Sequence, residues 1–144
     1  YDVIMVDAYR QPYIPFYLAT KEFFELARER LNPGGVVIVN AGHPEGNDDL
    51  ETVLGSTMAS VFPTVLRDPI EDTNTLLLGT EGEASAERLI RAIPDLPPEL
   101  RALAATQASK IGPRLPGDEV YTDDKAPVEW LIDRSILGYA AKED

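Results

Sequence analysis

The sequence predicts an α/β fold with an open sheet that is mostly parallel and ends in an antiparallel strand pair. Two short apolar runs, at residues 3–6 and 36–39, have the pattern of buried parallel strands. An amphipathic helical segment at residues 20–31 separates them, and a β-α-β order makes its two strands parallel. Further strands at 64–66 and 75–78 flank a short polar connection, so we expect them to pair antiparallel.

The first helix has a start signal and a stop signal. Thr20 can cap its N-terminus, and Phe23, Phe24, Ala27 and Leu31 recur with helical spacing. The Pro-Gly-Gly sequence at 33–35 ends this helix, because glycine readily adopts the left-handed turn that follows a helix.

A second helix is expected after Asn47 or Asp48, either of which can cap it. Its predicted apolar face consists of Leu50, Val53, Leu54, Met58 and Val61. Residues 67–72 are predicted to form the turn between the later two strands, since Asp, Pro and Glu are concentrated there.

Three helices are predicted after residue 85, at 86–93, 99–109 and 127–136. Proline at the first turn favours the start of the last one. We expect its core-facing residues to be Val128, Leu131, Ile132 and Ile136. We expect residues 1–144 to belong to one α/β domain.

The composition excludes several classes of function. With 25 acidic and 13 basic residues, the formal net charge is −12, which opposes nucleic-acid binding and tolerates a cationic small molecule. The chain has no cysteine, so thiol chemistry and cysteine-ligated zinc are excluded. The apolar runs are far shorter than the ~20 residues of a membrane helix, and no signal peptide pattern occurs, so we expect no membrane contact and a cytoplasmic location.

The first residues have the pattern of a strand that begins at or before Tyr1, and the sequence does not start with methionine. We therefore expect the chain to be a fragment that lacks an N-terminal, cofactor-binding half. No glycine-rich phosphate loop joins a strand to a helix anywhere in residues 1–144.

Candidate site residues follow the two predicted parallel strands, because ligands of open α/β sheets bind beyond the carboxyl ends of the strands. Asp7 directly follows the first strand. Its carboxylate can accept a proton from an amine nucleophile or bind an ammonium group, or it can cap a turn. Both interpretations stay open at this point.

Other residues of these loops also have both a functional and a structural interpretation. Tyr9 can stack on a ligand or pack against the sheet, and Arg10 can bind an anion or lie in solvent. His43, the single histidine, can act as a base, but with no second histidine and no cysteine we expect no metal site. Near the C-terminus, Tyr121 and Asp123 can bind a polyamine, or the aspartates can cap the following helix.

Three stretches together resemble spermidine synthases: Tyr-Asp-Val-Ile-Met-Val-Asp at 1–7, Thr-Lys-Glu-Phe-Phe at 20–24 and Leu-Asn-Pro-Gly-Gly-Val-Val at 31–37. The later Tyr-Thr-Asp-Asp-Lys-Ala-Pro-Val-Glu at 121–129 is similar to the end of bacterial spermidine synthase-like domains. The resemblance implies the C-terminal part of a Rossmann-like, methyltransferase-type domain.

In that family an aminopropyl group passes from decarboxylated S-adenosylmethionine to putrescine. The resemblance implies that Asp7 is the catalytic aspartate that deprotonates the amine, and that Tyr121 lines the amine site. Tyr9, Arg10 and Asp123 are the further candidate substrate-binding residues. Arg10 stands where the family has a second aspartate, which favours an acidic or otherwise different acceptor.

Two other functions stay open: a Rossmann-like methyltransferase that uses S-adenosylmethionine, and a non-catalytic domain of the same fold. Because the cofactor half is expected to be missing, we expect the isolated chain to bind neither form of S-adenosylmethionine and to be inactive. We also expect homo-oligomers that form through an exposed strand edge.

Overall fold

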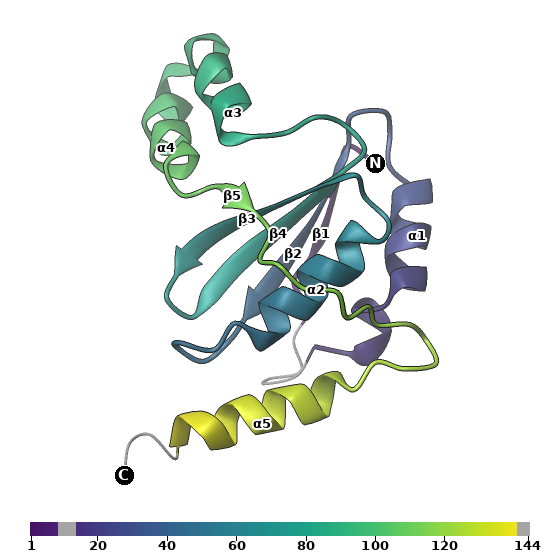
Figure 1. The fold of residues 1–144 in the computed structure, drawn as a ribbon. Coiled ribbons are helices and arrows are strands. Elements are labelled where there is room, and N and C mark those ends of the chain that lie inside the picture. The colour runs from purple at the N-terminus through teal and green to yellow at the C-terminus, as the bar shows by residue number, and fades with distance from the viewer. Residues whose placement is uncertain (9–13, 141–144) are drawn as a thin grey trace.

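The computed structural model describes residues 1–8 and 14–140 (Figure 1). Its elements are, in chain order, β1 (Val3–Val6), η1 (Phe16–Leu18), α1 (Lys21–Glu29), β2 (Val36–Gly42), α2 (Asp49–Ala59), β3 (Thr64–Glu71), β4 (Asn74–Thr80), α3 (Ala86–Ala92), η2 (Ile93–Asp95), α4 (Pro98–Ala108), β5 (Gly112–Pro113) and α5 (Val128–Ala140). Among these helices, none is long and apolar enough to cross a membrane.

The five strands form one open sheet in the order β1-β2-β4-β3-β5. This confirms the predicted α/β class and the antiparallel pairing of β3 with β4. In the described residues, however, β1 with β2 is the single parallel pair, and the other three pairs are antiparallel, so "mostly parallel" is wrong as a description of neighbouring strands.

The insertion of β4 explains this difference. Because β4 runs against both β2 and β3, those two strands must run in the same direction as each other and as β1. Strand β4 lies between β2 and β3, so these two strands, which run in the same direction, are not neighbours in the sheet. The order of elements along the chain does not predict the position of β4 between β2 and β3.

Strand β3 is longer than predicted. Residues 67–71 belong to the strand, and the turn consists of Asp72 and Thr73 alone. Pro69 is tolerated because β5 pairs only with Leu66 and Arg67, which leaves the following residues at an edge. The register shift between Pro69 and Glu71 marks the same irregularity.

Helices α2 and α4 lie on opposite faces of the sheet. Consecutive strand residues point to opposite faces, and Arg67 binds Glu51 of α2 whereas Asp68 binds Gln107 of α4. In Figure 1, α5 crosses below the end of the sheet where β2 ends.

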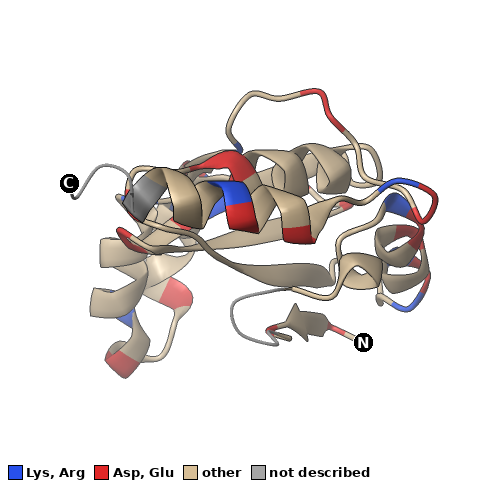
Figure 2. Cartoon of the chain, turned by 90° about the horizontal axis from the view of Figure 1, so that it is seen from below, with Lys and Arg blue, Asp and Glu red and all other residues tan. Residues whose placement is uncertain are grey.

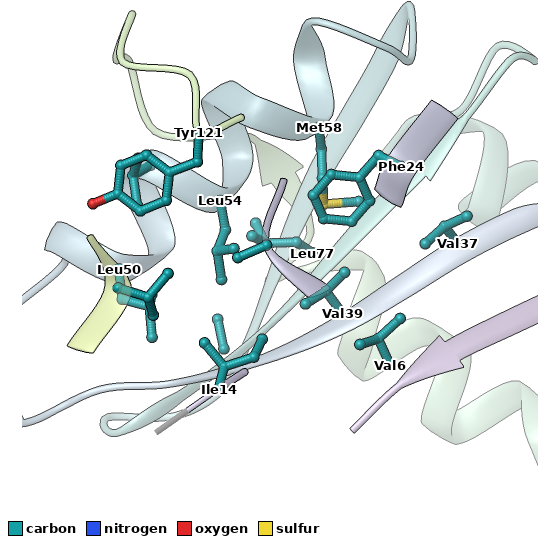
Figure 3. Packing of buried hydrophobic residues seen from close by; sticks show 14 of the residues in the cluster. Val6, Ile14, Phe24, Val37, Val39, Leu50, Leu54, Met58, Leu77 and Tyr121 are labelled. Atoms are coloured by element: carbon teal, nitrogen blue, oxygen red, sulfur yellow. The ribbon is translucent and has the colours of Figure 1, made fainter. Parts of the chain in front are cut away.

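The core lies between the sheet and α1, α2 and α5 (Figure 3). Strand β2 supplies Val37, Val39 and Ala41 by alternation, and the predicted apolar face of α2 is buried. At α5, Val128, Leu131 and Ile132 are buried as predicted, but Ile136 is exposed. The prediction for Ile136 is wrong because, among the described side chains of α5, those in the core cluster lie in its first two turns.

The predicted helix starts are largely confirmed. Thr20 accepts a hydrogen bond from the backbone N of Phe23 at 3.3 Å. At α2, Asn47 Oδ1 accepts from the backbone N of Asp49 at 3.1 Å, and the side chain of Asp48 makes no capping bond. Between α1 and β2, Gly34 has φ +82°, the left-handed conformation that favours glycine.

Candidate active site

Asp7 lies at the carboxyl end of β1, directly after the buried Val6, and its side chain is exposed. Because Val6 pairs with Val39 in the parallel register, the next positions on the two strands, Asp7 and Asn40, come side by side. This is the edge of the sheet at which ligands of open α/β folds bind.

Asn40 donates a hydrogen bond from Nδ2 to Asp7 Oδ1 at 2.9 Å. The bond orients the carboxylate and leaves Oδ2 without a partner among the described residues. A carboxylate held in this way can accept a proton from an ammonium group or bind it. The sequence indicated the loop after β2 but not Asn40 itself, since its role depends on the strand register.

Tyr121 is buried, with 2% of its surface exposed. Its backbone N donates to Thr57 Oγ1 at 3.0 Å, and its carbonyl accepts from the backbone N of Lys21 at 2.8 Å. Burial, followed by the charge of Glu119, raises the pKa of Tyr121 to about 12. The residue therefore joins α2 to the start of α1, and its phenol is neutral.

Asp123 lies in a tight turn closed by the bridge between Thr122 and Lys125. Its backbone N donates to Glu22 Oε2 at 3.0 Å, which fixes the turn at the first turn of α1. No described contact brings Asp123 to Asp7. The other two candidates, Tyr9 and Arg10, lie outside the described residues.

A buried ion pair near the same strand ends was missed by the sequence analysis. Both carboxylate oxygens of Glu51 accept from Arg67, and the Glu51 side chain is fully buried. Hydrogen bonding to Glu51 raises the pKa of the Arg67 guanidinium. The one available signal was the position of Glu51 within the apolar stretch of α2, between Leu50 and Val53.

His43 lies beside this pair. Its Nε2 is 3.5 Å from Thr75 Oγ1 and 4.0 Å from Glu51 Oε2, and its Nδ1 is 3.2 Å from the carbonyl of Pro44. The ligand atoms of His43, Asp48 and Glu51 lie within 4.8 Å of one another, a spacing that a metal ion could bridge. Because Arg67 already neutralises Glu51, this group is a poor metal site.

Comparisons with known proteins place this geometry in context. No family model matches the chain. The chain is 36% identical over 153 residues to a probable polyamine aminopropyl transferase of Bifidobacterium longum, a match that covers 91% of the chain and 34% of that protein. The structure is similar to that of a probable spermidine synthase from Corynebacterium glutamicum, with a TM-score of 0.58 and 22% identity over 85% of this chain and 47% of the other.

The fold and the strand-end carboxylate thus define a Rossmann-like α/β domain of the type found in spermidine synthases. The sequence match fits the spermidine synthase-like, or polyamine aminopropyltransferase, family. The chain spans about a third of the length of the curated relative and about half of that of the solved structure.

Proposed function

We propose that the chain is the part of a polyamine aminopropyltransferase that supplies the proton acceptor for the attacking amine. The observation that supports this is the Asp7 carboxylate, held by Asn40 at the carboxyl end of β1. The match to the polyamine aminopropyl transferase agrees with the proposal. Decarboxylated S-adenosylmethionine is the proposed co-substrate and would supply the aminopropyl group.

In the proposed step, the nitrogen of the amine attacks the carbon next to the sulfonium sulfur. A carbon–nitrogen bond forms, the carbon–sulfur bond breaks with its electron pair going to sulfur, and methylthioadenosine leaves. The nitrogen must lose a proton in order to attack, and Asp7 Oδ2 would accept it. Asn40 would keep the carboxylate oriented by its bond to Oδ1.

The roles of Tyr9, Arg10, Tyr121 and Asp123 in substrate binding stay predictions. The contacts of Tyr121 favour a role in packing, because its backbone and ring join three elements of the core. An acceptor other than putrescine stays a proposal that depends on Arg10. We also propose that the isolated chain binds neither form of S-adenosylmethionine and is inactive, and that the protein is cytoplasmic.

We further propose that the chain associates through β1. This strand forms one edge of the sheet, and its residues Val3 and Met5 are 54% and 60% exposed. An unpaired apolar edge strand favours pairing with another chain.

The experiment that tests the proposed function measures release of methylthioadenosine from decarboxylated S-adenosylmethionine. It compares putrescine with acidic and neutral amines, in the chain as it occurs in its whole protein, for the wild type and the Asp7→Asn variant. We expect turnover with an amine acceptor and its loss in the variant. Full activity of the variant would exclude Asp7 as the proton acceptor.

A further inference from the structure

Helices α3 and α4, with η2 between them, form an arm (residues 86–108) that stands apart from the other helices. In Figure 1 the two helices lie beside each other and away from α1, α2 and α5. Within the described residues, Ala108 is the single buried residue of the arm. One position before it, Gln107 Nε2 donates to Asp68 Oδ2 of β3 at 2.8 Å. The arm is therefore fastened to the sheet through the last turn of α4, and most of its surface is open.

The arm exposes large apolar side chains. Leu100 and Leu103 of α4 are 45% and 59% exposed, and Ile90 of α3 is 54% exposed. Leu100 and Leu103 are three positions apart, so they lie on one side of the helix. We propose that the arm is the contact surface for a second copy of this chain, with the two arms packed across a two-fold axis as four helices.

The charge of the arm permits contact between two copies. The arm carries as many basic as acidic residues: Arg88, Arg91 and Arg101 against Glu87, Asp95 and Glu99. The whole chain carries a net charge of −12, so the arm is a neutral surface on a strongly acidic molecule (Figure 2). Contact through the acidic remainder of the chain would bring like charges together, which opposes association.

The surface area of the chain agrees with an arm that is covered by a partner. The chain exposes 8543 Å², whereas a compact monomer of its mass, 15.8 kDa, exposes about 7,300 Å². The excess of about 1,200 Å² is larger than the roughly 800 Å² that each partner buries in a standard interface. A projecting arm adds surface in this way, and packing against a second arm would bury part of it.

The proposed contact is separate from the two proposals made above. The arm leads into β5, at one edge of the sheet, whereas β1 forms the opposite edge. It contains no residue of the candidate active site, so the proposal does not depend on the proposed function. Two short helices from each copy give an interface at the small end of the specific range, so we expect a dissociation constant on the order of 10–100 µM.

The test measures intermolecular paramagnetic broadening in the full chain, at a protein concentration above this dissociation constant. The chain has no cysteine, so Ala105→Cys on α4 introduces a single exposed thiol for a nitroxide label. Labelled protein is mixed with unlabelled ¹⁵N protein, and both carry Met5→Lys so that pairing through β1 is suppressed. We expect broadening of the amide signals of residues 86–108 and its loss on dilution. Added salt should strengthen it, because screening weakens the repulsion between the acidic copies.

Matched variants make the result decisive. Leu100→Lys with Leu103→Lys should abolish the broadening, because it places charges in the apolar contact. Trp130→Lys with Leu137→Lys makes the same change at two exposed apolar residues of α5 and should leave the broadening unchanged. An equal loss in this control, or an arm without broadening, would overturn the proposal. Broadening confined to β1 would assign association to the sheet edge, and broadening confined to β2 and β4 would place the arm of one copy on the sheet of the other; each of these results would also overturn it.

Discussion

Asn40 and Asp7 are joined across the parallel strands β1 and β2 by a hydrogen bond of 2.9 Å from Nδ2 to Oδ1. A second bond of the same kind lies before β1, where Nδ2 of the loop residue Asn32 donates to Asp2 Oδ1 at 3.0 Å. The two amide–carboxylate pairs have the same chemistry, but only the Asp7 pair lies at the edge of the sheet where ligands bind.

We therefore expect Asn40→Ala to lower activity about ten- to hundredfold, because a hydrogen bond to a charged group contributes about 1.5–3 kcal/mol. Asp7→Asn should lose roughly 10²- to 10⁴-fold, the range of general acid–base catalysis. Asn40→Asp should also lower activity, because it replaces the amide donor to Asp7 Oδ1 with a second negative charge. Asn32→Asp is the control, and a similar loss of activity in it would contradict a specific role for Asn40.

The Glu51–Arg67 pair should be asymmetric in its effect on stability. Arg67→Met leaves the fully buried Glu51 carboxylate without its partner, which costs about 3–5 kcal/mol of unfolding free energy. Glu51→Gln should cost less, because the Arg67 side chain is 26% exposed and can reach water. Urea denaturation measures both changes.

The double variant Glu51→Leu with Arg67→Met should recover much of the stability lost in Arg67→Met, since no unpaired charge is left in the core. The exposed pair Arg88–Glu83 is the control, and breaking it should change stability by less than about 1 kcal/mol. Equal losses in the two single variants of the buried pair would contradict this account.

Tyr121 should make the protein less stable at high pH. Burial raises its pKa from 10.0 to about 12 in the folded state, so above pH 10 the unfolded chain loses this proton first. The unfolded state then binds fewer protons than the folded state, and the free energy of unfolding falls as the pH rises from 10 to 12. Denaturation across this range should show a smaller fall in Tyr121→Phe. An identical fall in both proteins would assign the effect to other groups.

The edge of β1 should support self-association. Light scattering at micromolar concentration should give a mass above that of the monomer, most simply a two-fold dimer. Met5→Lys should reduce the association, because a lysine on an edge strand opposes pairing. Leu137→Lys, which changes another exposed apolar residue on α5, should have no effect. A wild-type chain that is monomeric under these conditions would refute the edge proposal.

The elements that could be predicted from the sequence are those with a local signal. The spacing of Phe24 and Ala27, the cap at Thr20 and the apolar run of β2 each depend on neighbouring residues, and each is confirmed. Strand β3 was predicted too short because Asp68 and Pro69 are typical turn residues. Their strand conformation depends on the pairing with β4, which lies outside the local sequence.

The candidate site shows the same difference between residues that have a local sequence signal and residues whose contacts depend on the fold. Asp7 could be predicted because it follows a strand in the sequence, whereas Asn40 became a partner only through the register of β1 and β2. The Glu51–Arg67 pair joins residues 16 positions apart on two elements, so neither residue signals the other. Tyr121 was assigned to ligand binding by resemblance, but its depth in the core depends on how the segment before α5 crosses α2.

The most direct test of the central claim is the identity of the product formed from an amine acceptor. Mass spectrometry should detect an aminopropylated amine when the protein, in its native context, is supplied with decarboxylated S-adenosylmethionine, and no methylated amine when it is supplied with S-adenosylmethionine. The aminopropylated product should disappear in Asp7→Asn. A methylated product, or an aminopropylated one formed equally by Asp7→Asn, would contradict the account.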